Sequence, residues 1–468
     1  MKKIKLLAFV DNPLGRDTEI LLPVTYLFEK HFNIEVKYKF IWDLLNIKIW
    51  RPDVILLPNV RGHNLYVEIA YFARKAGIIV LALDSEGNFP TDGSFDYWGY
   101  NKSKEIVQEW VTCWSQKTVD YAKTIIPTNG HNKIILTGAT GFDRYLFMPQ
   151  TSRAEMLGSL DAGHFTKVIG YAGWAFGKIH SHRKEESFVL FFPENRSYAW
   201  EWLENQRINV HEILKTAIQN NPKILFILKK HPKEDFEDQP IEGLNEMNEL
   251  IHYPNVRYIK NEFPIEDLIS TSDIWTGFET TTLFEAWLLK KPTIVLNNEV
   301  NFPRVPHYKG SLIAKDQNEF QSYIDAHFNE HNLETRLPTQ TIANRTSLMN
   351  AAIGFHDGFN HLRTLYYFRH SIPQVSAKKE IPLNWRHLRL YLLMHVGRFF
   401  YHKKLFLKLP GFRKSIYVFE NRNLPHFEKR KEKVYSALRG FHQKMKISPF
   451  LDENKWGDLS DFLRRNSE

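Results

Sequence analysis

The sequence predicts an α/β protein with two Rossmann-like, doubly wound domains that face each other across a cleft. Three observations lead to this fold class. The strand-like segments are apolar throughout, helix-like segments separate them, and the whole pattern restarts near the middle of the 468-residue chain. Strands that are apolar throughout are buried on both faces, which is typical of parallel sheets covered by helices.

The first unit is expected within residues 1–160. Its strand-like and helix-like segments alternate, as they do in repeated βαβ units. The expected strands are Ile4–Val10, Val54–Leu57, Ile78–Leu83 and Ile134–Leu136, and the expected helices are Ile20–Phe32 and Tyr66–Ala76.

The second unit is expected within residues 161–345, where the same alternation begins again. The expected strands are Lys167–Tyr171, Ile224–Leu228, Val256–Ile259, Ile274–Trp275 and Pro292–Leu296, and the expected helices are Trp200–Asn220, Pro264–Thr271 and Thr282–Leu289.

Residues 346–468 form a third segment, in which the strand signal fades and two helices are expected, over Leu383–Tyr401 and Phe427–Met445. The chain carries a net charge of +9. Residues 378–446 hold 18 Lys and Arg against 4 Asp and Glu, a local +14, which leaves −5 for the remainder. A basic, aromatic helix is typical of a segment that lies on an anionic membrane surface. The alternative is a helix that packs its aromatic side chains on the protein and solvates its charges.

The composition excludes several classes of protein. Hydrophobic residues make up 43% and charged residues 25%, which is ordinary for a globular protein. A single cysteine, Cys113, allows no intrachain disulfide and favours a reducing compartment. The first apolar run is short and Asp11 follows it, so a strand fits better than a signal peptide, and no run reaches the ~20 apolar residues of a membrane span. We therefore expect a cytoplasmic protein, held peripherally on the inner face of the cytoplasmic membrane. Nucleic-acid binding is disfavoured, because the positive charge is confined to one segment and no standard motif accompanies it.

Candidate functional residues follow the expected strands, because open α/β sheets bind ligands at the carboxyl ends of their strands. Asp84-Ser85-Glu86-Gly87 follows the strand Ile78–Leu83. A carboxylate of Asp84 or Glu86 there can serve as a general base. The alternative is a helix cap or a solvated turn.

A basic motif, Lys229-Lys230-His231-Pro232, follows the strand Ile224–Leu228. Lysine and histidine donors at a strand end can bind phosphate oxygens and stabilise the charge of a nucleotide leaving group, and the proline fixes their loop. The alternative is a solvated basic loop, above all for Lys229 and Lys230.

A hydroxyl-rich motif, Gly277-Phe278-Glu279-Thr280-Thr281-Thr282, leads into the helix that follows it. Hydroxyl groups and free backbone N–H groups at a helix start can bind an anion. The alternative is ordinary N-capping by threonine. Glu285, one turn into the helix, can accept hydrogen bonds from ribose hydroxyls.

A glycine-bearing loop, Gly170 to Gly177, follows the strand Lys167–Tyr171, and Gly173 at its centre would let a ligand approach the backbone closely. The loop is neither a dinucleotide fingerprint nor a Walker loop. His180 and His182 have no third ligand in view, so no metal site is expected.

Taken in this order, Ser85-Glu86-Gly87, His231-Pro232 and Thr280-Thr281-Thr282 resemble the motifs of bacterial GT-B glycosyltransferases that use CMP-activated nonulosonic or ulosonic acids. These are the sialyltransferases and the Kdo or pseudaminic acid transferases of capsule and lipopolysaccharide assembly. The resemblance spans roughly residues 1–345, and the departure is Ser85, where that family has an acidic residue.

The resemblance implies a metal-independent transfer from a CMP-sugar donor, a co-substrate rather than a cofactor, to a glycan or lipid-linked glycan acceptor. Glu86 or Asp84 would be the base and His231 would support departure of CMP. Donor-binding residues would be Lys230, Pro232, Gly173, Glu279, Thr280, Thr281, Thr282 and Glu285.

Three alternatives remain open at this point. One is a CDP-polyol phosphotransferase of the teichoic-acid type, and another is a single-lobed GT-A enzyme in which Asp84-Ser85-Glu86 binds a metal ion. The third is a non-catalytic scaffold at the membrane surface in polysaccharide assembly.

Overall fold

The computed structural model describes residues 3–10, 16–60, 64–88, 106–174, 196–231, 249–260, 262–299, 309–330, 333, 337–374, 380–402, 424–451 and 456–465. The chain divides into two compact units. The first consists of Met1–Phe89, Trp98–Met148 and Asn350–Glu468, and the second of Pro90–Tyr97 and Pro149–Met349. Both are Rossmann-like α/β units with parallel strands, which confirms the predicted fold class.

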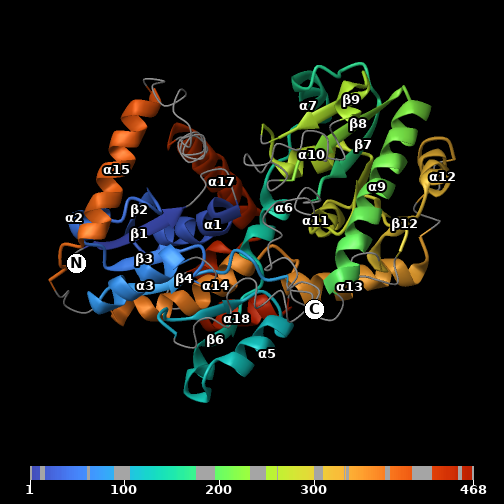
Figure 1. The fold of residues 1–468 in the computed structure, drawn as a ribbon. Coiled ribbons are helices and arrows are strands. Elements are labelled where there is room, and N and C mark those ends of the chain that lie inside the picture. Colours follow the sequence, from blue (N-terminus) through green and yellow to red (C-terminus); the bar gives the residue numbers. More distant parts are fainter. Residues whose placement is uncertain are drawn as a thin grey trace. The chain divides into compact units, whose positions relative to one another are not determined.

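The sheet of the first unit contains β1 (Ile4–Val10), β2 (Ile34–Phe40), β3 (Val54–Leu57) and β4 (Ile79–Ala82), all parallel and in the order β2-β1-β3-β4 (Figure 1). A second parallel pair is formed by β5 (Val111–Cys113) and β6 (Ile134–Leu136). The backbone N–H of Glu109 donates to the carbonyl of Val80 at 2.8 Å, so the chain leading into β5 runs beside β4. The order of the strands reverses between β1 and β3.

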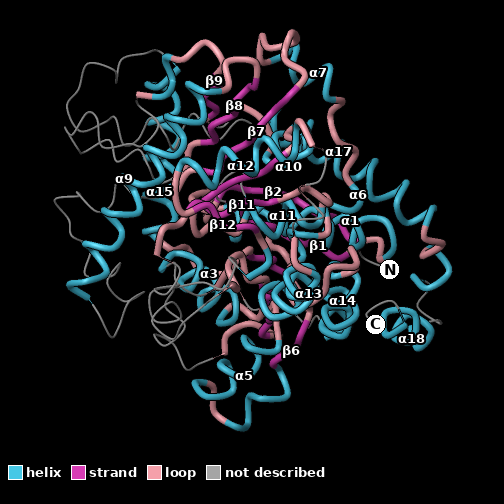
Figure 2. The backbone as a smooth tube through the Cα atoms, turned by 90° about the vertical axis from the view of Figure 1, so that its right-hand side faces the viewer, coloured by secondary structure: helices cyan, strands magenta, loops and turns pink. Residues whose placement is uncertain are grey.

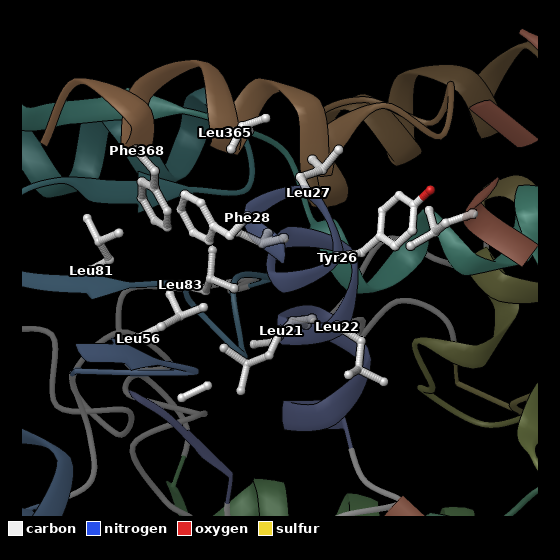
Figure 3. Packing of buried hydrophobic residues seen from close by; sticks show 14 of the residues in the cluster. Leu21, Leu22, Tyr26, Leu27, Phe28, Leu56, Leu81, Leu83, Leu365 and Phe368 are labelled. Carbon is white, nitrogen blue, oxygen red and sulfur yellow. The ribbon is translucent and has the colours of Figure 1, made fainter. Parts of the chain in front are cut away.

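Alternate residues of β1 enter two different apolar clusters, which explains why this strand is apolar throughout. Leu6 and Ala8 pack in one cluster with α1 (Arg16–His31) and α14 (Asn360–Phe368), and Figure 3 shows Phe28 of α1 and Phe368 of α14 in it. Leu7 and Phe9 pack in another cluster with α3 (Asn64–Lys75). The sheet is therefore buried on both faces, as a parallel sheet requires.

The remaining helices of the first unit are shorter or come from the C-terminal part of the chain. They are α2 (Asn46–Trp50), α5 (Gln116–Ile125), α6 (Arg144–Phe147), α15 (Trp385–His402), α17 (Leu424–Lys444) and α18 (Trp456–Arg465). Residues 346–468 were expected to form a separate segment, but from Asn350 onward they belong to the first unit.

Buried polar contacts and apolar packing attach α17 to the first unit. Arg430 donates through Nε to Glu19 of α1 at 2.7 Å, and the hydroxyl groups of Tyr435 and Tyr38 lie 2.9 Å apart. Leu438 is fully buried in the cluster that contains α1. The basic residues of α17 therefore sit on a helix whose apolar side completes the core.

A buried chain of polar side chains joins three elements of the first unit. Asp143 accepts from the backbone N–H of His361 at 2.8 Å and lies 2.7 Å from Nδ1 of the same residue. Nε2 of His361 lies 2.9 Å from Nε2 of His442 on α17, and the two rings stack with an interplanar angle of 4°. Burial, helped by the nearby His361 and His31, lowers the pKa of His442 to about 2.

The second unit has a six-stranded parallel sheet. Its strands are β7 (Lys167–Ala172), β8 (Ile224–Lys229), β9 (Val256–Ile259), β10 (Ile274–Gly277), β11 (Thr293–Leu296) and β12 (Leu312–Ala314). They lie in the order β12-β11-β10-β7-β8-β9, and Figure 2 shows β7, β8 and β9 running side by side. Numbered along the chain, this is the 3-2-1-4-5-6 order of a Rossmann domain.

The helices of the second unit are α7 (Arg153–Ser159), α9 (Arg196–Asn220), α10 (Ile265–Thr271), α11 (Thr282–Leu288) and α12 (Gln317–Phe328). They are followed by α13 (Thr339–Ile353), along which the chain passes from the second unit into the first. One predicted feature differs in the first unit: β2 was not expected. Its sequence alternates apolar residues with Glu35, Lys37 and Lys39, because it is an edge strand and only partly buried.

Within the described ranges, no helix is both long and apolar enough to span a bilayer.

Replacement of His442 by Gln should flatten the acid dependence of stability. In the unfolded chain His442 takes up a proton below its ordinary pKa of 6.5, whereas in the folded chain it does so only near pH 2. The unfolded state therefore binds more protons between these values, and stability falls as the pH falls. We expect the wild type to lose about 1.4 kcal/mol per pH unit relative to His442→Gln between pH 6 and 4. Urea denaturation at several pH values measures this, and parallel curves for the two proteins would contradict it.

Candidate functional site

The order of strands in the second unit reverses between β7 and β10, which lie side by side at the centre of the sheet. In doubly wound sheets this reversal leaves a crevice beyond the carboxyl ends of the two strands, and ligands bind there. The structure places Gly173 directly after β7 and Phe278-Glu279-Thr280 directly after β10, and Ala172 pairs with Gly277 across the two strands. Two of the motifs singled out in the sequence are thus brought together by the fold.

The close pairing of β7 and β10 depends on a glycine opposite a tryptophan. Gly170 of β7 is the partner of Trp275 of β10, and a Cβ at Gly170 would lie 2.3 Å from the Trp275 ring. The ring is fully buried over this glycine, and its Nε1 donates to Oγ1 of Thr282 at 2.9 Å. The glycine therefore makes room for a side chain that holds the start of α11.

The turn after β10 is equally tight. A Cβ at Gly277 would lie 2.5 Å from Cγ2 of Thr280, so a larger residue would displace the threonine. The backbone N–H of Thr280 donates to the carbonyl of Phe278 at 2.9 Å. This geometry turns the chain sharply from the strand into α11.

The three threonines have different surroundings. Oγ1 of Thr280 accepts from the backbone N–H of Thr282 at 3.2 Å and lies 3.1 Å from Oγ1 of Thr282, which also accepts from Trp275. These two hydroxyls therefore stabilise the turn, in the manner of a threonine bonded two residues along the chain. Thr281 is half-buried, and in the part of the chain that the structure describes its hydroxyl has no hydrogen-bond partner. Of the three, Thr281 is the hydroxyl best able to bind a ligand.

An aromatic cluster supports the ends of β7 and β10. Phe278 is fully buried, with its ring centroid 5.5 Å from that of Trp174 and 5.5 Å from that of Trp202 on α9. The Trp174 ring meets Phe278 edge to face. Sequence reasoning missed Trp202, because nothing in a helical pattern shows which of its buried positions reaches a strand end.

The basic motif after β8 lies next to the reversal, because β8 pairs with β7. Nζ of Lys229 donates to the carbonyl of Lys230 at 2.9 Å and to that of Lys260, so this ammonium is held by the backbone. The backbone N–H of Lys230 donates to Ile259 at 2.9 Å, which continues the pairing with β9. His231 follows and is half-buried, while Pro232 lies outside the described residues.

The other predicted donor-binding residues are placed as follows. The backbone N–H of Gly173 donates to the carbonyl of Lys229 at 2.8 Å, so this N–H extends the sheet. Glu279 and Glu285 are both buried, the first in the turn after β10 and the second on α11. The part of the glycine-bearing loop beyond Trp174 lies outside the described residues.

The predicted carboxylates of the first unit follow β4, an outer strand of the four-stranded sheet. Asp84 is buried, and its backbone carbonyl accepts from Nε1 of Trp114 at 2.7 Å. A Cβ at Gly87 would lie 2.3 Å from the Trp114 ring, so the glycine allows the loop to lie against this ring. Glu86 between them is half-buried. The loop that carries both carboxylates is therefore fixed by one tryptophan.

No group of three His, Cys, Asp or Glu side chains in the described ranges is arranged to hold a metal ion.

No protein-family model matches the sequence, and no curated protein matches it. Solved structures do match the fold. A putative UDP-N-acetylglucosamine 2-epimerase from Listeria monocytogenes aligns with a TM-score of 0.52 and 12% identity, covering 82% of this chain and 100% of that one. A second UDP-N-acetylglucosamine 2-epimerase aligns with a TM-score of 0.51 and 12% identity over the same shares. At this identity the likeness shows the fold, which is GT-B-like with two Rossmann-like domains.

The predicted transfer of a nonulosonic acid from a CMP donor is wrong. The solved structures that share the fold are UDP-N-acetylglucosamine 2-epimerases, which point to a UDP-sugar enzyme, and CMP-dependent transferases are not among those named above. The physical reason for the error is that His231-Pro232 and Thr280-Thr281-Thr282 are short phosphate-type motifs at strand ends. Such motifs suit any nucleotide that places a phosphate there, and they carry no information about the base.

Replacement of Thr282 by Val should destabilise the second unit, whereas replacement of Thr281 by Val should not. Thr282→Val removes the acceptor of the fully buried Trp275 Nε1, and a buried donor without a partner costs about 1–3 kcal/mol. Thr281→Val keeps a β-branched side chain at a half-buried position and serves as the matched control, with a change within about 0.5 kcal/mol. Chemical denaturation of the three proteins measures this, and equal stabilities would contradict the assigned role of Thr282.

Proposed function

We propose that this chain is an enzyme that acts on a UDP-activated sugar and binds the nucleotide with its second unit, beyond the carboxyl ends of β7 and β10. The observation that carries the proposal is the reversal of strand order at these two strands, with Thr281 beside it. The reversal identifies where a Rossmann-like sheet binds a nucleotide. The fold shared with two UDP-N-acetylglucosamine 2-epimerases supports a UDP-sugar as the nucleotide.

In this proposal the phosphates of the UDP-sugar contact hydroxyl and cationic groups around the reversal. Thr281 donates its hydroxyl, and His231 and Lys230 approach from the end of β8, next to β7. Charge-assisted bonds of this kind stabilise the negative charge of a nucleoside diphosphate. Gly173 and Pro232 shape the loops that flank the phosphates.

Buried carboxylates complete the proposed site. Glu285 on α11 accepts from the ribose hydroxyls, with Glu279 beside it in the turn. Thr280 and Thr282 hold that turn in place. Asp84 and Glu86 of the first unit are the proposed proton-transfer groups for the sugar, because they are carboxylates on a loop that Trp114 fixes.

The choice of nucleotide tests this proposal directly. We expect isothermal titration to detect binding of UDP and of UDP-N-acetylglucosamine, and much weaker binding of CMP. Saturation at about 100 times the dissociation constant should raise the unfolding free energy by about 2.7 kcal/mol. Thr281→Val should weaken UDP binding by about fivefold to tenfold, since one hydrogen bond to a charged group contributes about 1.5 kcal/mol or less when water can replace it.

Binding of CMP with equal or greater affinity than UDP would refute the proposal. Turnover is followed by proton NMR of UDP-N-acetylglucosamine in D₂O. A change at the sugar with deuterium incorporation and no release of UDP would assign an epimerisation that breaks a C–H bond, whereas release of UDP only with an added acceptor would assign a transfer. No change in the sugar under either condition would contradict an enzyme that uses this substrate.

A further inference from the structure

One face of α15 is apolar and exposed. Eleven large hydrophobic side chains are exposed among the described residues, and six of them lie within residues 383–399. On α15 itself they are Trp385 (73% exposed), Leu392 (52%), Leu393 (55%), Val396 (52%) and Phe399 (59%). A monomeric soluble protein scatters such residues singly, so a cluster on one helix marks an interaction surface.

The spacing of these residues places them on one side of the helix. Trp385, Leu392, Val396 and Phe399 are separated by seven, four and three positions, which returns each to the same face, and Leu393 lies beside them. Exposed Arg389 falls within the same face. The result is a continuous apolar stripe with a cation in it.

The opposite side of α15 is attached to the first unit. His387 is buried, and its ring centroid lies 4.7 Å from that of Phe72 on α3. Leu390 packs on the apolar cluster that contains Leu7 and Phe9. Arg386 pairs with Glu68 at 2.9 Å. The stripe is therefore presented by an anchored helix, and Figure 1 shows the later turns of α15 extending away from the sheet beside α2.

The charge of α15 decides which partner fits. The helix contains three Arg and no Asp or Glu, and it lies in a segment, residues 378–446, with 18 Lys and Arg against 4 Asp and Glu. A second copy of this chain would bring two strongly basic surfaces together, which like-charge repulsion opposes. An anionic lipid surface offers phosphate groups for the arginines and an apolar layer for the stripe.

We propose that α15 lies in the plane of an anionic membrane surface, with Trp385, Leu392, Val396 and Phe399 inserted below the headgroups and Arg389 at the lipid phosphates. The tryptophan suits this depth, because its ring is apolar and its N–H remains near water. This inference is independent of the proposed nucleotide, because it rests on a different helix of the first unit.

Sedimentation of the full chain with vesicles tests the proposal. The wild type should co-sediment with vesicles of phosphatidylglycerol and phosphatidylcholine, and much less with phosphatidylcholine alone. The double variant Leu392→Glu/Val396→Glu should bind the anionic vesicles at least about tenfold more weakly, because it places two anions in the stripe. Arg389→Gln should reduce binding to anionic vesicles by about fivefold and leave binding to phosphatidylcholine unchanged.

The matched control is Ile208→Glu/Ile342→Glu, which makes the same change at two exposed isoleucines of the second unit, 49% and 51% exposed. It should bind vesicles as the wild type does, and circular dichroism should show that all variants are folded. The proposal is overturned if the wild type stays in the supernatant, or if Leu392→Glu/Val396→Glu binds as the control does. It is also overturned if light scattering shows a dimer that this variant converts to a monomer, since the stripe would then be covered by a second copy.

Discussion

The pairing of β10 with β7 is the constraint on which the second unit depends. Two strands that are distant in sequence lie side by side there, and the sheet grows outward from them in opposite directions. The pairing is possible because Gly170 leaves space for the Trp275 ring. That ring then fixes Thr282 and with it the first turn of α11. One cross-strand contact thus sets both the reversal of the sheet and the position of the turn beside it.

Most of the fold follows from local sequence patterns. The boundaries of β1, β3, β6 and β9 are those expected from their apolar runs, because strands buried on both faces cannot carry polar residues in their interior. The edge strand β2 was missed, since its lysines and glutamate hide the apolar alternation. The placement of residues 350–468 in the first unit was not predicted either. Contacts such as Arg430 with Glu19 join residues that are 411 positions apart, and no local pattern reports them.

The candidate site was predictable in its position but not in its detail. Strand ends in a doubly wound sheet can be found from sequence, so the segments around Gly173 and Thr280 were identified. The division of work among the threonines was not, because it depends on where the Trp275 indole points. The base of the nucleotide was assigned wrongly for a related reason. Recognition of a base uses groups from several segments in space, whereas the motifs that were read are short and contact phosphate.

The two units differ in what they contribute to the account. The second unit carries the reversal and the proposed nucleotide contacts, and the first carries a fixed pair of carboxylates and the anchored helix α15. A crystal structure of the chain soaked with UDP tests the central claim most directly. The account predicts a diphosphate beyond β7 and β10, with an oxygen within hydrogen-bond distance of Thr281. A diphosphate bound elsewhere, with Thr281 still facing solvent, would contradict it.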